Sequence, residues 1–218
     1  MSQKYRILLL ASGAGTIAQS IIDAAIEKRI DLDIVGLISD QNSPALARAK
    51  RSNIQNFYMP LIQPRQAWDD KLILQVSELN PDLVVSVGFM RILSQSFLLK
   101  FKVINSHPSL LPDFPGAHAV ADCLAAGATR SGCTIHWVDE GLDTGKIIAQ
   151  QEVEILEADS HDSLHERIKI QERRLIIEVL QKVKENYNKD LDILGILITM
   201  FRKRTILSND VVKVLNEQ

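Results

Sequence analysis

Three polar side chains in this sequence are of types that hold an oxygen atom or move a proton. Asn105 and His107 lie two residues apart, and Asp143 lies in a later loop that contains glycines. Side chains two positions apart on an extended segment project to the same side, so the amide and the imidazole can grip one oxygen. A carboxylate can then set the charge and orientation of the histidine, a pairing that active sites use near neutral pH. We therefore expect all three residues at one site.

The segment 105–116 is a stiff loop after a strand. It contains three prolines and ends in Gly116, and loops at the carboxyl ends of strands line the ligand crevice of open α/β sheets. For His107 alone, a histidine hydrogen-bonded in the core is the competing interpretation, but Asn105 and the rigid loop favour a site. His118 and His136 are candidate pocket residues. His136 falls inside a predicted strand, where it would form a pocket wall or a hydrogen-bond partner.

A second motif, Ser12-Gly13-Ala14-Gly15-Thr16, lies between the first predicted strand and the first predicted helix. Glycines let the backbone approach a phosphate, and the positive end of the helix dipole favours that anion. Read together with Ala18, the stretch also matches G-x-G-x-x-A, and Asp40 stands where a dinucleotide-binding protein holds a ribose hydroxyl. A dehydrogenase, or a tight turn that binds nothing, is therefore an alternative.

Composition limits the class of protein. A chain of 218 residues with 46% hydrophobic residues is long enough for one sizeable core and favours a single domain. A net charge of −2 provides no basic excess for binding nucleic acid. The polar start and the short apolar run after it fit neither a signal peptide nor a membrane span, so we expect a cytoplasmic protein without a membrane partner. Cys123 and Cys133 lack the spacing of a zinc or redox motif and are expected to be reduced thiols.

Apolar runs and helical segments alternate along the chain, which predicts an α/β fold with a mainly parallel sheet and right-handed crossovers. Strands are expected at Tyr5 to Ala11, Asp33 to Ser39, Asp82 to Val87 and Val103 to Ser106, with a later pair, expected to be antiparallel, at Gly132 to Val138 and Lys146 to Glu154. Helices are expected at Ile17 to Lys28, Pro44 to Arg51, Arg65 to Leu79, Ala117 to Ala126 and Ser160 to about Lys184, the last with Ser160 as its cap.

The C-terminal part differs in character from the rest. Residues 1–186 are expected to form the catalytic domain, and 187–218 an extension. The apolar stretch Leu191 to Phe201 is too short to span a bilayer. We expect it to be a strand or helix that packs on the same domain or lies at a subunit contact, and the sequence leaves a homodimer open.

Four motifs occur in an order that resembles the phosphoribosylglycinamide formyltransferase family. They are S-G-x-G at Ser12 to Gly15, G-F-M-R-I-L at Gly88 to Leu93, N-x-H-P-S-L-L-P-x-F-P-G at Asn105 to Gly116, and H-x-V-x-x-x-L-D-x-G at His136 to Gly145. The resemblance implies the formyltransferase fold, a Rossmann-like, mainly parallel twisted sheet with helices on both faces. It also implies transfer of a formyl group from 10-formyltetrahydrofolate, as co-substrate, to glycinamide ribonucleotide in purine biosynthesis, without a metal.

The resemblance also assigns roles to residues. Asn105 and His107 would meet the charge that develops on the formyl oxygen, and Asp143 would keep His107 protonated and help to carry the proton. The phosphate and ribose of the ribonucleotide would contact Gly13, Ala14, Gly15, Thr16 and Glu172. The folate would lie against Met90, Arg91, Ile92 and Leu93 and against Glu140, Gly141 and Leu142.

One departure and three alternatives remain. Many relatives have Ser-Asn-Leu where this chain has Thr16-Ile17-Ala18, so a side-chain amide contact to the ribonucleotide is missing. A methionyl-tRNA formyltransferase would share the catalytic residues, but it resembles a longer protein with a basic C-terminal domain. An NAD-dependent dehydrogenase leaves residues 105–116 unexplained. A non-enzymatic sensor of a phosphate ligand would need the glycine turn but not Asp143.

Overall fold

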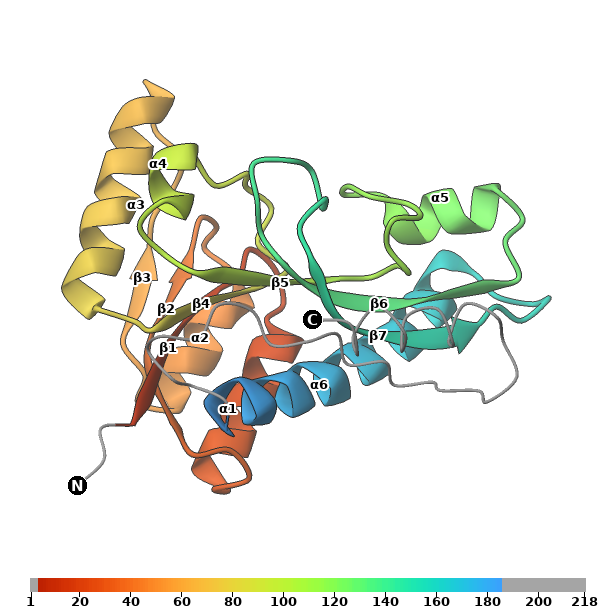
Figure 1. Ribbon diagram of the computed structural model, residues 1–218, viewed down its shortest axis with the longest axis horizontal. Helices are drawn as coiled ribbons and strands as arrows, with labels where there is room; N and C mark the ends of the chain where they lie inside the picture. Colours follow the sequence, from red (N-terminus) through yellow and green to blue (C-terminus); the bar gives the residue numbers. More distant parts are fainter. Residues whose placement is uncertain (1–3, 186–218) are drawn as a thin grey trace, which may run out of the picture.

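The computed structural model describes residues 4–185, and within them seven strands form one twisted sheet in the order β3-β2-β1-β4-β5-β6-β7 (Figure 1). The first five strands in this order are parallel, and β6 and β7 are antiparallel to their neighbours. The strands are β1 (Tyr5–Leu10), β2 (Leu32–Ser39), β3 (Asn56–Tyr58), β4 (Leu83–Val87), β5 (Val103–His107), β6 (Arg130–Trp137) and β7 (Ile147–Glu154).

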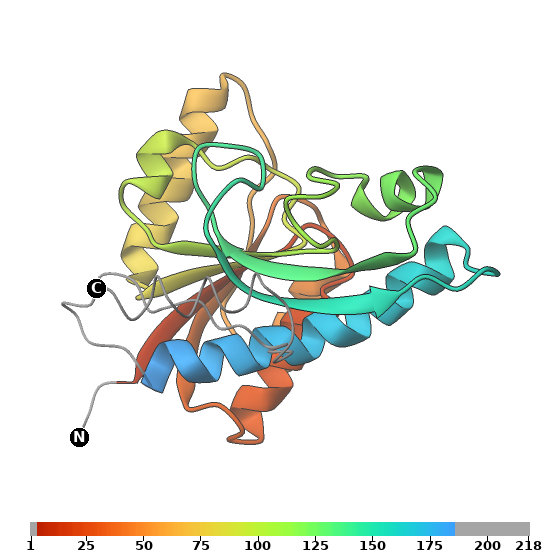
Figure 2. The same cartoon turned by 45° about the vertical axis from the view of Figure 1, so that its right-hand side comes forward.

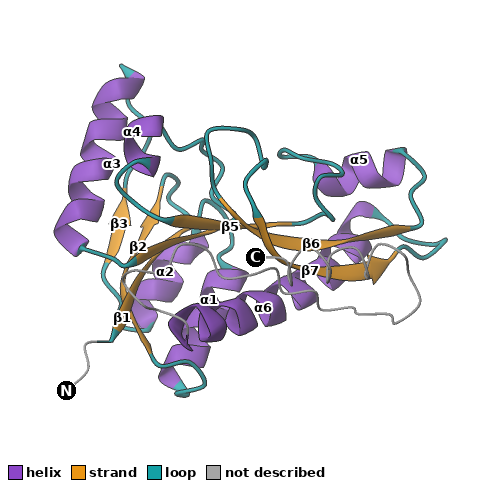
Figure 3. Ribbon diagram, viewed as in Figure 1, coloured by secondary structure: helices purple, strands orange, loops and turns teal. Residues whose placement is uncertain are grey.

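Helices cover both faces of the sheet, as predicted. In Figures 1 and 3, α1 (Thr16–Ile26) and the long α6 (His161–Glu185) lie below the sheet, and α3 (Arg65–Leu79) and α4 (Gln95–Leu98) lie above its left half. The short α2 (Pro44–Arg51) packs beside α1, and α5 (Ala119–Ala125) contacts α6 at the other end of the sheet, which the turned view in Figure 2 brings forward.

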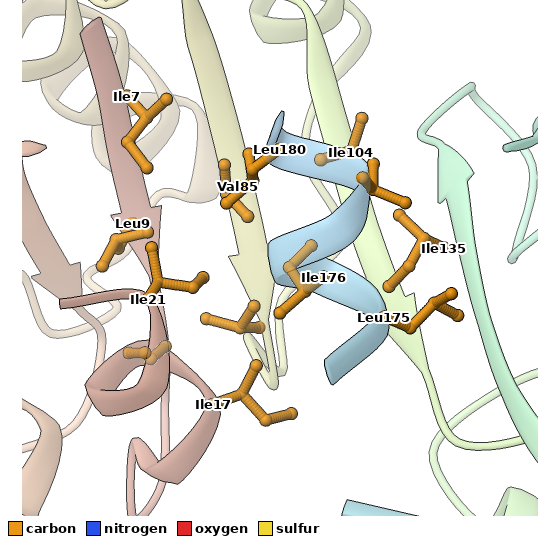
Figure 4. Close-up of a cluster of buried hydrophobic side chains, with 14 of the residues drawn as sticks. Ile7, Leu9, Ile17, Ile21, Val85, Ile104, Ile135, Leu175, Ile176 and Leu180 are labelled. Atoms are coloured by element: carbon orange, nitrogen blue, oxygen red, sulfur yellow. The ribbon is translucent and has the colours of Figure 1, made fainter. Parts of the chain in front are cut away.

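The larger core lies between the sheet and the α1/α6 layer (Figure 4). Alternate residues of the parallel strands point into it, because successive side chains of a strand face opposite sides. Ile176 of α6 lies among strand and α1 residues there and is fully buried. The members drawn in the figure include Ile7, Leu9, Ile17, Ile21, Val85, Ile104, Ile135, Leu175 and Leu180.

A second core fills the opposite face, under α3 and α4. Trp68 of α3 and Phe97 of α4 are its largest fully buried side chains, and they cover the strand residues that alternate with those of the first core, among them Leu8, Leu10 and Val84. Because both faces are covered, β1 and β4 consist almost entirely of apolar residues, which explains why the sequence predicted them well.

Most predicted elements are confirmed, with ends that move by one or two residues. Helices at Pro44–Arg51 and Arg65–Leu79 match their predictions fully. The cap of α6 is also confirmed, because the Ser163 N–H donates to Ser160 Oγ (3.2 Å) and the Ser160 N–H donates to Ser163 Oγ (2.9 Å). The short elements β3 and α4 were not predicted. The predicted start of the α5 helix was two residues early, because His118 has a non-helical backbone (φ −113°, ψ 18°).

Two further predictions concern the cysteines and the C-terminal extension. Cys123 and Cys133 are both buried and free, as expected for reduced thiols. The predicted Leu191 to Phe201 element lies outside the described residues. None of the helices between residues 4 and 185 has the length and apolarity needed to cross a membrane.

Candidate active site

The predicted site residues gather at the carboxyl edge of the parallel strands. Because β1 and β4 are neighbours in the sheet, their connections leave in opposite directions, and a crevice forms outside their carboxyl ends at such a switch point. Residues 12–16 follow β1, residues 88–93 follow β4, and Asn105 and His107 lie at the end of β5. The sequence therefore brings three of its motifs to one place through topology alone.

Asn105 is held with its amide group in a fixed orientation. Its Oδ1 accepts a hydrogen bond from Ser86 Oγ on the neighbouring strand β4 (2.7 Å), and its Nδ2 lies 3.3 Å from His136 Nε2. His136 stands opposite Asn105 in the antiparallel pairing of β5 and β6, which puts the two side chains on the same face. Since Ser86 occupies the oxygen, the amide nitrogen is the group that is presented as a donor.

His107 is 4% exposed and has an oxygen acceptor at each ring nitrogen. Its Nε2 lies 2.9 Å from the Phe114 carbonyl oxygen, and its Nδ1 lies 3.4 Å from Asp143 Oδ2. A carbonyl oxygen can only accept, so Nε2 carries a hydrogen. In the doubly protonated ring both N–H groups have acceptors, which is the arrangement expected of a proton-handling histidine.

Asp143 lies in the loop between β6 and β7, which arches over the end of β5 in Figures 1 and 3. Its Oδ2 accepts the Gly116 N–H (2.8 Å), and its Oδ1 lies 3.5 Å from His136 Nε2. Burial alone would raise the pKa of Asp143, but the hydrogen bonds from His136 and Gly116 and the charges on His107 and His136 hold that pKa below its ordinary value of 3.8. The carboxylate is therefore charged at neutral pH.

His136 is more central than the sequence indicated. It contacts both Asn105 and Asp143, and its Nδ1 lies 2.9 Å from the Trp137 carbonyl oxygen, so Nδ1 carries a hydrogen. A neutral ring then accepts from Asn105 at Nε2, whereas a charged ring donates to Asp143. His136 is thus a hydrogen-bond partner within this cluster, and its place in a ligand pocket stays a prediction. His118, in contrast, is exposed at the start of α5.

The stiff loop after β5 is fastened to the two antiparallel strands. Thr134 Oγ1 donates to the Ser109 carbonyl (2.7 Å) and accepts the Leu111 N–H (3.1 Å), while Gln150 Nε2 donates to the Leu111 carbonyl (2.8 Å). Phe114 has a left-handed backbone (φ 54°), a conformation that is uncommon outside glycine, and its carbonyl is the acceptor for His107. The loop therefore sets the orientation of the imidazole.

The glycine turn after β1 leads directly into α1. Gly15 is the residue before the helix, with φ 69°, and no side chain caps the first turn. A Cβ on Gly15 would come within 2.7 Å of Ala45 Cβ, so the turn packs closely on α2. Gly13 and Ala14 are exposed, and Arg48 Nε of α2 donates to the Ala14 carbonyl (2.8 Å). Backbone N–H groups at a helix N-terminus beside a guanidinium form a suitable anion site.

Ile17 occupies the position at which the sequence departs from many relatives. Its side chain is 9% exposed and packs in the larger core (Figure 4). The position therefore faces the core rather than the glycine turn.

The segment after β4 presents apolar side chains at the crevice. Met90 and Ile92 are 61% and 69% exposed, whereas Leu93 is buried. Arg91 extends to Asp40, with Nε 2.6 Å from Oδ2. Arg65 of α3 donates to the Ile92 carbonyl from the other side, so the segment is held at both ends while its apolar side chains remain open to a flat ligand.

The loop that contains Glu140 is hydrogen-bonded to the start of α4, the helix that follows residues 88–93. Glu140 Oε1 accepts a hydrogen bond from Gln95 Nε2 at the start of α4 (2.6 Å), and Leu142 is 56% exposed. Asp139 shapes the loop by accepting the Gly141 N–H (3.1 Å) and the Thr144 hydroxyl (2.7 Å). Both segments predicted to contact folate thus carry exposed apolar side chains and are linked through α4.

Glu172, which was predicted to contact the ribose, is buried inside the protein. It is 3% exposed, and its Oε1 accepts the Ser106 hydroxyl (2.6 Å). Ser106 points to the opposite face of β5 from Asn105 and His107, so Glu172 approaches the strand from the α6 side. Burial raises the pKa of Glu172 although the Ser106 hydrogen bond acts in the other direction.

Some site residues were missed by the sequence prediction. Ser86, which orients Asn105, could have been recognised from the sequence, because it is a polar residue inside the apolar run of β4. Asp40 was considered only for the dinucleotide alternative. Its carboxylate is fully buried and is occupied by Ser12, Arg91 and Gln41, so it does not face a ribose, and the dehydrogenase alternative loses its support.

Comparisons with known proteins place this chain among formyltransferases. A family model described as "Formyl transferase" matches residues 5–180. The chain is 41% identical over 209 residues to phosphoribosylglycinamide formyltransferase of Mycobacterium tuberculosis, a match that covers 94% of this chain and 95% of that protein.

Solved structures give the same result. Glycinamide ribonucleotide transformylase 1 from Symbiobacterium toebii is similar with a TM-score of 0.83 and 36% identity, over 89% of this chain and 93% of that chain. Phosphoribosylglycinamide formyltransferase from Bacillus halodurans is similar with a TM-score of 0.80 and 34% identity, over 83% and 96% of the two chains.

Proposed function

The chain belongs to the formyl transferase family, and from this premise we propose that it transfers the formyl group of 10-formyltetrahydrofolate to the amine of glycinamide ribonucleotide. The products are formylglycinamide ribonucleotide and tetrahydrofolate, a step of purine biosynthesis. The observation that carries the proposal is the juxtaposition of Asn105, His107 and Asp143, which contact one another directly or through His136.

Asn105 and His107 stabilise the charge that develops on the formyl oxygen. The neutral amine attacks the formyl carbon, a new C–N bond forms, and the electron pair of the carbonyl moves to oxygen. When His136 is neutral and accepts one hydrogen of Asn105 Nδ2, the second hydrogen remains for the formyl oxygen, and His107 becomes the second donor when its Nε2–H leaves the Phe114 carbonyl. Donors oriented in advance toward that oxygen lower the barrier.

In this proposal Asp143 assists the transfer of a proton from the attacking amine to N10 of the folate. As the intermediate collapses, the bond between the formyl carbon and N10 of the folate breaks, and N10 takes up the proton that the attacking amine has lost. The carboxylate lies 3.4 Å from His107 Nδ1, and it provides a nearby base through which the proton can pass, directly or through a water molecule.

Most of the remaining predicted residues have binding roles in this proposal. The phosphate lies on the Gly13 to Thr16 turn. Glu172, which is buried against Ser106 on the α6 side of β5, is assigned no ribose contact. The folate lies between residues 90–93 and residues 140–142, where exposed apolar side chains can cover a flat ring. A homodimer and a cytoplasmic location remain predictions from the sequence.

The test compares acceptors. Purified full-length protein is assayed with 10-formyltetrahydrofolate and either glycinamide ribonucleotide or methionyl-tRNA. We expect turnover with the ribonucleotide and none with the tRNA. Turnover with the tRNA alone would assign the second formyltransferase function, and turnover with neither would overturn the proposal.

A further inference from the structure

Asp40 is a buried carboxylate that the proposed chemistry does not use. It follows β2 at the same edge of the sheet as the active-site segments, and its side chain is 0% exposed. A buried charge is unfavourable unless it is paired and hydrogen-bonded. Its partners therefore indicate why this position carries a carboxylate.

The two oxygens of Asp40 reach two different substrate-binding segments. Oδ1 accepts the hydroxyl of Ser12 (2.5 Å), the residue directly before the glycine turn. Oδ2 accepts Arg91 Nε (2.6 Å), from the segment predicted to contact folate, and also Gln41 Nε2 (3.1 Å). One carboxylate thus joins the segment after β1 to the segment after β4.

Ser12 joins the same two segments a second time. While its hydroxyl donates to Asp40, the hydroxyl oxygen accepts the Met90 N–H (2.8 Å), and the Ser12 N–H donates to the Gly88 carbonyl (2.9 Å). The Ser12 hydrogen points at the Asp40 carboxylate, so a lone pair of the hydroxyl oxygen is left to point at the Met90 N–H. Asp40 therefore orients the Ser12 hydroxyl.

We propose that Asp40 is a positioning residue that fixes the spacing between the ribonucleotide-binding turn and the folate-binding segment, so that both substrate sites are formed before either ligand binds. The proposal rests on the proposed function, because it assigns the two segments to the two substrates. A site that is formed before its ligand arrives needs no ordering on binding, so the effect of Asp40 should appear in the affinity for each ligand.

The charge, and not only the shape, of Asp40 is required. Burial alone would raise the pKa of Asp40, but the hydrogen bonds from Ser12, Arg91 and Gln41 and the charge on Arg91 lower it, so the group is a carboxylate at neutral pH. An amide in its place has one acceptor oxygen and one NH₂ group. Facing Arg91, the NH₂ group would meet another donor and that link would be lost; facing Ser12, it would make the hydroxyl an acceptor and leave the hydroxyl hydrogen without its carboxylate partner.

The test is Asp40→Asn, with Asp33→Asn as the matched control. Asp33 lies at the other end of the same strand and makes an exposed pair with Arg6 (3.5 Å), and exposed pairs contribute little. Initial rates give KM for each substrate and kcat. Titration calorimetry with glycinamide ribonucleotide alone and tetrahydrofolate alone gives the two dissociation constants without turnover.

For Asp40→Asn we expect KM and the dissociation constant to rise about tenfold for both ligands, since disturbing either charged link releases the spacing that both segments share, while kcat changes less than KM. Asp33→Asn should behave as the wild type. A purely structural role would reduce the active fraction, which lowers kcat and leaves both KM values unchanged, and that result would overturn the proposal. A rise confined to one ligand would also overturn it.

Ser12→Ala provides a second variant in case Asp40→Asn does not fold. It removes the hydroxyl that bonds both Asp40 and Met90, and it should weaken both ligands in the same way. If the wild type transfers no formyl group, the proposed function fails. If the wild type is active but Asp40→Asn and Ser12→Ala bind both ligands normally, only the role of Asp40 fails.

Discussion

Replacing Asp143 with asparagine removes one charge from the candidate site and leaves its shape almost unchanged. The amide oxygen can still accept the Gly116 N–H that Asp143 Oδ2 accepts at 2.8 Å. What is lost is the negative charge 3.4 Å from His107 Nδ1. We expect the variant to fold and to bind both substrates, but to transfer the formyl group slowly.

The size of the effect follows from the distance. Two unit charges 3.4 Å apart attract by about 1 kcal/mol in bulk water and by about 5 kcal/mol at the effective dielectric of about 20 typical of proteins. The Asp143 and His107 side chains are only 13% and 5% exposed, so the value lies toward the upper figure. Since each 1.36 kcal/mol corresponds to about a factor of ten in rate, we expect kcat to fall by about 10²–10³.

The assay is the initial rate of tetrahydrofolate formation at saturating concentrations of both substrates. Asp139→Asn is the matched control, because Asp139 lies in the same loop but bonds only the loop itself, through Gly141 and Thr144. Its kcat should stay within about twofold of the wild type, as is usual for exposed positions. If Asp143→Asn retained more than a third of the wild-type kcat while the control behaved normally, the assignment of Asp143 would be refuted.

Three other predictions test separate parts of the site. Asn105→Ala should lower kcat by about 10²–10³ through loss of an oxyanion donor, and unchanged steady-state kinetics would remove Asn105 from the mechanism. Glu172→Gln should become more stable relative to the wild type as pH rises above about 4.5. The pKa of Glu172 is raised in the folded wild type, so the folded state keeps a proton that the unfolded chain releases, and wild-type stability falls. Urea unfolding of both proteins at a series of pH values measures this difference, and the opposite slope would contradict it. Arg48→Ala, which removes the guanidinium at the Ala14 carbonyl, should raise KM for the ribonucleotide about twofold to fivefold and leave KM for the folate unchanged, and an equal rise in both would argue against a local phosphate contact.

The sequence predicted the parts of the fold in which local pattern and environment agree. Strands β1 and β4 are covered on both faces, so they appear as unbroken apolar runs. Strand β3 has three residues, two of them exposed, and α4 has four residues, so neither is long enough to show a periodic pattern.

The candidate site was predictable where two residues share one segment. Asn105 and His107 are two apart on a strand, and alternation alone puts them on one face. The contact of Asn105 with His136 depends on the register between β5 and β6, which joins residues far apart in the sequence. The same is true of Asp40, whose partners Ser12 and Arg91 come from other crossover units. Contacts that depend on register and topology could not be derived from residue types and local spacing.

The central claim is that this site moves a formyl group from folate to the ribonucleotide amine. The most direct measurement is a single-turnover experiment with 10-formyltetrahydrofolate labelled in the formyl carbon, glycinamide ribonucleotide and excess wild-type protein. We predict that the label appears in formylglycinamide ribonucleotide in step with the release of tetrahydrofolate. Label that stays on the folate, or that is released as free formate, would contradict the claim.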